Sequence, residues 1–296
     1  MPTAVLITNP KSGARLDGAL RGRPELDTLE EAGIHVTPLK GSIAKQVAQS
    51  LAHPADIVIV DGGDGTINAV LGAHERDSRP IGILPGGTMN LLATDYGVPH
   101  DRVEAARVIA AGHTRAVDGA TIGGRLFLHT ALTGLPARIG VHREDRRGKL
   151  GVRQKAALAV HAFATRHKDP MLDLEITRSD GAHEGLHAST FAILVGSVSG
   201  SLLPRPNRDV AAGELTAFAI DPDDGAALAL LVMKGAFGLS HDEALRRCLI
   251  ERARLSGQRR KVHAMVDGES VLVSLPAQIA VRPKIANILS LREEAP

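Results

Sequence analysis

The feature that most constrains this chain is the hexapeptide DGGDGT at residues 61–66, which lies between an apolar run, Ile57–Val60, and a helical pattern. Glycines remove the β-carbons that would hold a ligand away from the backbone. The N-terminus of the following helix adds unpaired amide groups and the positive end of the helix dipole. A strand, a glycine turn and a helix in this order predict a phosphate-binding turn. The alternative interpretation is a tight connection in which the glycines serve only the backbone.

A carboxylate, Asp64, lies in the middle of this turn. A turn that only binds anions has no use for a negative side chain, so Asp64 indicates a metal ion or a water network beside the phosphate. A second glycine turn, PGGTMN at residues 85–90, follows the apolar run Ile81–Leu84. Two such turns at one sheet edge make a nucleotide site more credible than either turn alone.

The first 120 residues alternate apolar runs with helical patterns. Strands are predicted at residues 4–7, 34–39, 57–60 and 81–84, and helices at residues 26–32, 42–51, 66–73 and 101–110. This alternation predicts a parallel sheet wrapped by helices, with ligands at the carboxyl ends of the strands.

After Asp118 the pattern changes to runs of strands. They are predicted at residues 125–130, 172–177, 188–195, 215–220, 249–255, 262–266 and 271–275, with two helices at about 150–167 and 226–239. Such runs indicate a second, mainly antiparallel domain.

Composition excludes several classes of protein. The net charge of +2 and the 2% of aromatic residues argue against a nucleic-acid partner. One cysteine, Cys248, permits no intramolecular disulfide and favours a reducing compartment. No segment approaches the roughly 18 apolar residues of a membrane span, and no signal peptide is recognisable. We therefore expect a cytoplasmic protein.

Four motifs in order resemble the diacylglycerol kinase catalytic family, which includes sphingosine kinases and bacterial lipid kinases. They are NPKSG at residues 9–13, GGDGT at 62–66, PGGTMN at 85–90 and VDGE at 266–269. NAD kinases share the second motif, so an NAD kinase-like enzyme is one alternative. The third motif argues against it, because NAD kinases lack the Pro-x-Gly-Thr-x-Asn segment.

The resemblance implies an α/β fold class, with an N-terminal doubly wound nucleotide-binding domain and a second, mainly antiparallel β-sandwich domain. The first domain is expected at residues 1–120, with the last segment, about 279–296, able to return to it. The second, lipid-binding domain is expected at residues 121–278.

The implied activity is phosphoryl transfer from ATP, with Mg²⁺, to a lipid hydroxyl, first of all that of diacylglycerol or a related lipid. Glu269 is expected to accept the hydroxyl proton, and Asp64 to act in catalysis and contact the metal. The nucleotide-binding residues are expected to be Asn9, Lys11, Ser12, Gly13, Gly62, Gly63, Gly65, Thr66, Gly87, Thr88 and Asn90. A homodimer is left open.

The chain departs from the family at two points. Bacterial lipid kinases carry an Asn-Glu pair after GGDGT, where this chain has Asn68-Ala69. They also carry an Asp-Gly-x-Leu-Asp segment that helps to hold a structural metal, where residues 212–216 read AGELT. Asp209 or Glu214 could substitute for the missing carboxylates. A second alternative is therefore a non-catalytic homologue that binds nucleotide or lipid.

A basic segment, HREDRRGKLGVRQK at residues 142–155, precedes an apolar helical pattern. Each basic residue near anionic phospholipid contributes on the order of 1 kcal/mol to membrane binding. The segment therefore predicts a transient, peripheral membrane contact, while a solvated surface is the alternative.

Overall fold

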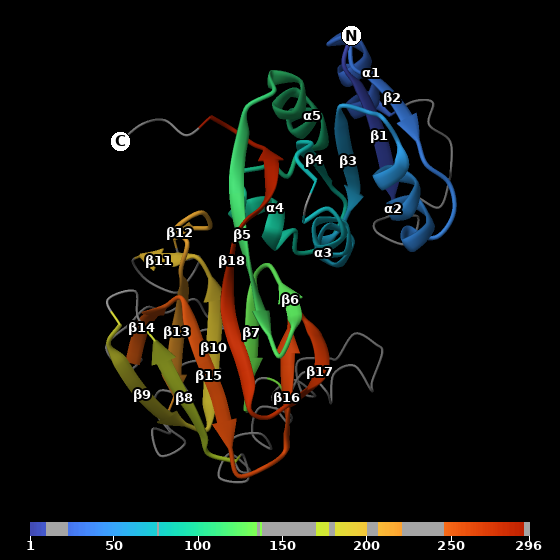
Figure 1. Ribbon diagram of the computed structural model, residues 1–296. Coiled ribbons are helices and arrows are strands. Elements are labelled where there is room, and N and C mark those ends of the chain that lie inside the picture. Colours follow the sequence, from blue (N-terminus) through green and yellow to red (C-terminus); the bar gives the residue numbers. More distant parts are fainter. Residues whose placement is uncertain are drawn as a thin grey trace, which may run out of the picture. The chain divides into compact units, whose positions relative to one another are not determined.

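The computed structural model describes residues 1–9, 23–75, 77–134, 137, 170–177, 181–199, 207–220 and 246–292. The chain divides into two compact units (Figure 1). Unit 1 comprises Met1–Asp118 and Pro283–Pro296, and unit 2 comprises Gly119–Arg282. The chain therefore leaves unit 1 once and returns to it with its last segment. No helix within the described ranges is long and apolar enough to cross a bilayer.

Unit 1 is built on a parallel sheet whose strand order is β2-β1-β3-β4-β18. The strands are β1 (Thr3–Thr8), β2 (His35–Pro38), β3 (Ile57–Gly62), β4 (Ile81–Pro85) and the end of β18 (Ala277–Leu289). Every residue of β3 and β4 is buried. Continuous apolar runs form these strands because helices cover both faces of a parallel sheet.

Among the described residues of unit 1, five helices accompany this sheet: α1 (Pro24–Glu31), α2 (Ile43–Ala52), α3 (Asp64–Ala73), α4 (Leu91–Asp95) and α5 (Arg102–Ala111). Helix α1 contacts helix α5 and strand β2, and α5 also contacts strand β4. Helix α2 contacts helix α3 and strand β1, and α3 also contacts strand β3. Asp101 caps α5 by accepting the amides of Val103 (3.0 Å) and Glu104 (2.9 Å). The α/β class predicted for the N-terminal half is confirmed.

The described residues of unit 2 form two groups of antiparallel strands and a two-stranded ribbon. One carries β18, β15 (Arg252–Gly257), β8 (Leu172–Thr177) and β9 (His183–Ala188), and β18 also pairs with β5 (Thr114–Ile122), which pairs with β6 (Arg125–Phe127). The other has the order β14 (Arg246–Ile250), β13 (Leu215–Ile220), β10 (Thr190–Val195), β7 (Thr130–Thr133), β16 (Lys261–Val266), β17 (Glu269–Ser274). A ribbon joins β11 (Ser197–Ser199) and β12 (Asn207–Asp209). Residues of both sheets share one hydrophobic core, so the predicted sandwich is confirmed.

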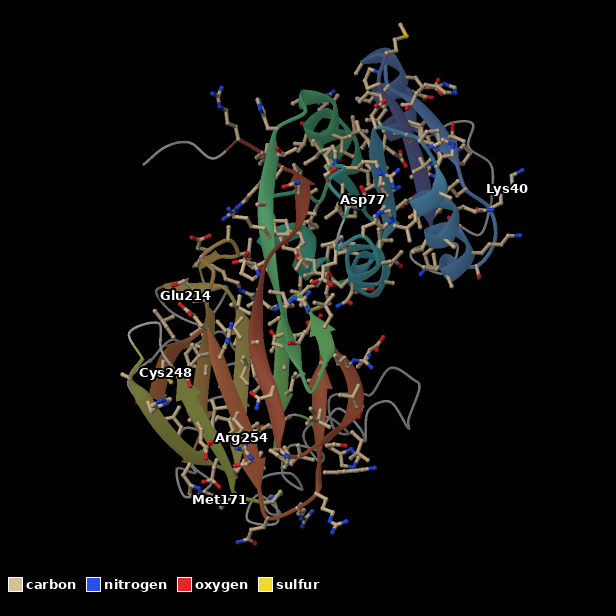
Figure 2. All side chains as sticks on the ribbon, viewed as in Figure 1. Lys40, Asp77, Met171, Glu214, Cys248 and Arg254 are labelled. Atoms are coloured by element: carbon tan, nitrogen blue, oxygen red, sulfur yellow. The ribbon has the colours of Figure 1, made fainter. Side chains whose placement is uncertain are left out.

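Cys248, labelled in Figure 2, lies on β14, belongs to this core and is 6% exposed. The predicted strand at 249–255 is wrong, because β14 and β15 belong to different sheets. Glu251 and Arg252 are consecutive exposed residues, which breaks the alternation of a single strand. Strand β9 was not predicted, since only two of its six residues, Leu186 and Ala188, are buried.

The six-stranded sheet has a second apolar face. Register places Met265 beside Leu132, Leu132 beside Ala192, and Ala192 beside Phe218, in one row across four strands. Ala192 and Phe218 belong to a cluster separate from the main core. An antiparallel sheet that is apolar on both faces requires a covering layer on each. The two helices predicted at 150–167 and 226–239 lie outside the described residues.

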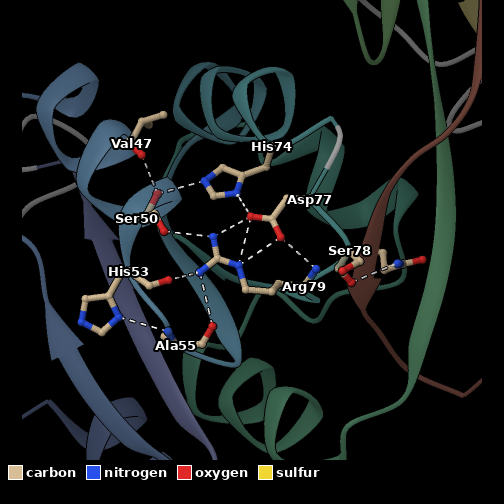
Figure 3. A network of polar contacts seen from close by, with 9 residues as sticks. Val47, Ser50, His53, Ala55, His74, Asp77, Ser78 and Arg79 are labelled. Atoms are coloured by element: carbon tan, nitrogen blue, oxygen red, sulfur yellow. Dashed lines mark hydrogen bonds and ion pairs between the residues drawn. The ribbon is translucent and has the colours of Figure 1, made fainter.

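A polar network joins the connections that lead into β3 and β4 (Figure 3). Arg79 binds the Asp77 carboxylate and donates to the carbonyl oxygens of Ser50 (2.9 Å) and His53 (2.8 Å). Hydrogen bonds from Arg79 hold the pKa of Asp77 well below its ordinary value. Nδ1 of the buried His74 lies 2.8 Å from Asp77 Oδ2, and burial lowers the pKa of His74. The network therefore fixes the amino ends of two central strands.

We expect Arg79→Met to lower the free energy of unfolding by about 3 kcal/mol, because it removes the guanidinium that donates to the Asp77 carboxylate and to three backbone carbonyl oxygens. Urea unfolding followed by circular dichroism measures this loss. Arg107→Met is the matched control, since Arg107 is exposed and forms a surface ion pair with Glu104 one turn away. It should change the free energy by less than about 0.5 kcal/mol. Equal losses in the two variants would contradict the structural importance of the network.

Candidate functional site

The two glycine turns follow adjacent parallel strands and lie against each other. The Gly86 amide donates to the Gly62 carbonyl oxygen over 2.9 Å. A β-carbon on Gly87 would lie 2.7 Å from Gly63 Cα, and one on Gly63 would lie 3.0 Å from Gly87 Cα. Such approach is closer than side chains permit, so both positions require glycine because the two backbones touch.

Asp64 and Asn90 fasten the two turns together. Asp64 is the first residue of α3, and its Oδ1 accepts the Leu92 amide of α4 over 2.9 Å. Asn90 Oδ1 accepts the Gly87 amide over 2.8 Å, and its φ of 48° lies in the left-handed region that asparagine tolerates. Both residues were predicted as ligand contacts, and both also hold the local backbone.

Asn9 and Thr66 connect the end of β1 to the first turn of α3. Asn9 Nδ2 donates to Thr66 Oγ1 over 2.9 Å, and the Asn9 amide donates to the Asp61 carbonyl oxygen. Gly62 is needed here because a β-carbon would lie 2.7 Å from Thr66 Cβ. Thr66 is 5% exposed, so its hydroxyl serves this junction between elements.

Gly65 is different from the other glycines of the site. It lies in the first turn of α3, is exposed, and a β-carbon there would meet no atom of the described residues within 4 Å, its own helix backbone and chain neighbours aside. A glycine in a helix costs roughly 1 kcal/mol relative to alanine. Among the described residues, packing and backbone strain do not require it. Thr88 is also exposed in the neighbouring turn.

A ring of four charges, three of them buried and Arg102 partly exposed, underlies the two turns, and it was not predicted. Asp61, the residue before Gly62, binds Arg23 through Oδ2 and Arg102 through Oδ1. Both arginines also bind Glu25, each with a shortest contact of 3.0 Å. A carboxylate at the end of an apolar strand signals that a cation must lie nearby. The partners of Asp61 could not be identified from the sequence, because Arg23 is 38 residues away and Arg102 is 41 residues away.

Electrostatics within this ring favour the charged forms of Glu25 and Arg102. Burial opposes the ionised form of Glu25, but hydrogen bonds from its backbone and from both arginines lower the pKa of Glu25 below its ordinary value. Burial likewise favours neutral Arg102, but the charges of Asp61 and Glu25 raise the pKa of Arg102. The two groups thus stabilise each other's charge.

Asp267 and Glu269 have separate environments in unit 2. The Asp267 carboxylate accepts the amides of Leu128 (2.7 Å), His129 (2.9 Å) and Thr130 (2.9 Å). Burial raises the pKa of Asp267 although these bonds oppose the increase. Glu269 begins β17, is exposed, and forms an ion pair of 2.5 Å with Arg125. The motif therefore combines a structural aspartate with an exposed glutamate.

His129 is held neutral beside this motif. Arg208 Nη2 donates to His129 Nδ1 over 2.8 Å, so the ring proton of the neutral imidazole is on Nε2. Burial and the nearby charge of Arg208 lower the pKa of His129 to about 4. No sequence pattern indicated this pair, since the residues are 79 positions apart.

Metal-binding groups are few in the described parts of the chain. Within those ranges no three His, Cys, Asp or Glu side chains gather as a metal site would require. Asp209 accepts the Ala211 amide over 3.0 Å, and the Glu214 carbonyl accepts the Gly196 amide over 2.9 Å. Of the two candidates for the structural metal, Asp209 thus uses one carboxylate oxygen locally, whereas the bond at Glu214 involves its backbone alone.

Several predicted functional residues lie outside the described residues. They are Lys11, Ser12, Gly13 and the basic segment at 142–155. The described nucleotide candidates come together in unit 1 at the ends of β1, β3 and β4. Glu269 belongs to unit 2.

Comparison with known proteins relates this site to a family. Residues 3–122 match the sequence profile of the diacylglycerol kinase catalytic domain. A diacylglycerol kinase of Staphylococcus saprophyticus is 37% identical over 138 residues, covering 44% of this chain and 45% of that protein. One of Staphylococcus haemolyticus is 34% identical over 150 residues, covering 48% and 45%. The chain thus matches less than half the length of these curated relatives.

Solved structures resemble the chain over nearly its whole length. A diacylglycerol kinase of Bacillus anthracis strain Sterne aligns with a TM-score of 0.66 over 98% of this chain and 96% of its own, at 22% identity. A second structure from that organism gives a TM-score of 0.70 over 99% and 98%, at 23% identity. These similarities establish a shared fold.

We expect Asp267→Asn to lower the free energy of unfolding by about 2 kcal/mol, because one amide group cannot replace a carboxylate that accepts three backbone hydrogen bonds. Glu269→Gln is the matched control and should cost less than about 0.5 kcal/mol, since its exposed ion pair contributes little. Thermal and urea unfolding measure both. A larger loss in Glu269→Gln would contradict the division between a structural and an exposed carboxylate.

The free energy of unfolding should decrease as the pH falls from about 6.5 to 4, because the unfolded chain then binds a proton that the folded His129 excludes. The loss from this residue is at most about 3 kcal/mol and ceases below the folded-state pKa. His129→Asn keeps an acceptor near Nδ1 and cannot titrate. Its urea unfolding across this pH range should vary less than that of the wild type, and parallel curves would refute the assignment.

Proposed function

We propose that this chain is a lipid kinase, because its residues 3–122 belong to the diacylglycerol kinase catalytic-domain family. The reaction is transfer of the γ-phosphoryl group of ATP, with Mg²⁺, to a lipid hydroxyl. Diacylglycerol is the first candidate acceptor, followed by related lipids. The observation that carries the proposal is the pair of touching glycine turns at the carboxyl ends of β3 and β4.

These turns suit a triphosphate for three physical reasons. Helix α3 begins at Asp64, and the first amides of a helix have no intrahelical partners and attract anions. Gly65 leaves the surface of that first turn open. The β1–β3 pair is also where the strand order reverses, the usual ligand position in such sheets.

The residues present fit a magnesium ion that arrives with its nucleotide. Mg²⁺ keeps several waters and needs only one or two carboxylates besides the substrate phosphates. Asp64 supplies one carboxylate, and only one of its oxygens is used by the Leu92 amide at 2.9 Å. The ion would neutralise negative charge that develops during transfer.

Glu269 is the proposed acceptor of the hydroxyl proton. Its exposed carboxylate projects from the start of β17, after a turn in which Gly268 has a φ of 84°. Asp267 fixes that turn through three backbone hydrogen bonds. A fixed turn can present the carboxylate in a constant orientation, which is what a general base requires.

The protein would act in the cytoplasm and meet its substrate at the membrane surface. The basic residues Arg146, Arg147 and Lys149 are the proposed contacts with anionic lipid. Attraction of this kind is weakened by salt, so the contact is reversible.

A panel of lipid acceptors tests the function directly. Purified protein is incubated with radiolabelled ATP, Mg²⁺ and detergent micelles that contain diacylglycerol, monoacylglycerol, a sphingoid base or undecaprenol. We expect phosphate transfer to diacylglycerol or a related glycerolipid. Transfer to none of them would overturn the proposal, and phosphorylation of NAD would replace it with an NAD kinase-like activity.

Asp64→Asn should reduce kcat by more than about a hundredfold, because a missing charge beside the transferring phosphate costs roughly 3 kcal/mol. The amide oxygen can still accept the Leu92 hydrogen bond, so the melting temperature should be unchanged. Asp27→Asn, on the exposed face of α1, is the matched control and should keep wild-type kcat. More than a few per cent of wild-type kcat in Asp64→Asn would remove Asp64 from the mechanism.

A further inference from the structure

One guanidinium group reaches the residue before each pair of glycines. Arg102, the first residue of α5, donates from Nη1 to the Pro85 carbonyl oxygen over 2.9 Å, and Pro85 precedes Gly86. Its Nη2 lies 2.8 Å from Asp61 Oδ1, and Asp61 precedes Gly62. Arg102 thus connects the two strands at the point where each enters its turn.

The turns beyond this connection have no room to shift closer. Gly63 and Gly87 already approach so closely that a β-carbon on Gly87 would lie 2.7 Å from Gly63 Cα. Contact therefore sets the minimum separation of the turns. The bonds from Arg102 to both strand ends oppose an increase in that separation.

Stability alone does not account for this ring of charges. Burying ions costs several kcal/mol each, and apolar replacements of buried ion pairs are often as stable or more so. What an arginine provides and an apolar side chain lacks is a planar group with donors in fixed directions. Glu25 supports this orientation because it accepts from both Nε (3.1 Å) and Nη2 (3.0 Å) of Arg102.

We propose that Arg102 is a positioning residue for the nucleotide: it holds the two glycine turns at the separation that the phosphates require. This inference rests on the proposed nucleotide site and assigns no contact between Arg102 and the ligand. Glu25 and Arg23 assist Arg102 in this role. Arg23 binds Asp61, Glu25 binds Arg102, and Arg23 and Glu25 also bind each other.

Equilibrium titration with a fluorescent ATP analogue and Mg²⁺ tests this role without depending on a lipid. The variants are Arg102→Met, which removes the donors, and Arg102→Lys, which retains the charge but lacks the planar, forked arrangement of N–H donors. Arg79→Met controls for lost stability, because the partners of Arg79 among the described residues lie at the amino ends of β3 and β4, away from the turns at their carboxyl ends. Arg107→Met controls for a changed surface charge on the same helix.

We expect Arg102→Met to raise the nucleotide Kd by at least about tenfold and Arg102→Lys by an intermediate factor, since small displacements of a binding group have large effects. Both controls should remain within about twofold of wild type. In the lipid kinase assay, KM for ATP should rise in the Arg102 variants while KM for lipid is unchanged.

The outcomes separate this inference from the proposed function. Wild-type protein that binds no nucleotide would overturn both. Wild-type affinity in Arg102→Met would overturn only the positioning role, as would an equal rise of Kd in Arg79→Met, which would assign the effect to general destabilisation. If Arg102→Met does not fold, Arg102→Lys decides, and an unchanged Kd in that variant refutes the requirement for the guanidinium fork.

Discussion

The contact between the backbones of Gly63 and Gly87 is the constraint on which the described part of the site depends. Strands β3 and β4 are neighbours, so their following turns must occupy one small region of the sheet edge. Any side chain at either glycine would push the turns apart. The same contact brings Asp64 to the start of α4, where it accepts the Leu92 amide. Geometry and candidate chemistry therefore involve the same few residues.

Much of the fold could be predicted because burial leaves a simple pattern. The fully buried β3 and β4 read as apolar runs, and the strands Leu172–Thr177 and Leu215–Ile220 have the predicted boundaries. Prediction was wrong where the chain changes sheets between β14 and β15, since a sheet change leaves no apolar gap. It also omitted β9, whose exposed residues include His183 and His187.

The site was predictable in its glycines and carboxylates but not in what holds them. DGGDGT predicts a turn, but the sequence does not show that Gly63 must be glycine because of Gly87. It also does not show that no neighbour among the described residues requires glycine at position 65. Arg102 gave no sign of its role, because its partners come from Glu25, Asp61 and Pro85, distant in the chain. Asp267 was predicted only as part of a motif, and its role as an acceptor of three amides became evident from the structure.

The position of β18 has a consequence for how the chain folds during synthesis. Strand β4 is flanked by β3 on one side and by β18 on the other, and β18 ends at Leu289. A ribosome releases the whole of Gly119–Arg282 before the residue that pairs with Ile81 emerges. Until then β4 is an edge strand with unpaired backbone groups, a known risk for association with other chains. The nascent N-terminal unit is thus made first but lacks its last strand until the rest of the chain has been synthesised, so the edge of β4 stays open for that whole interval.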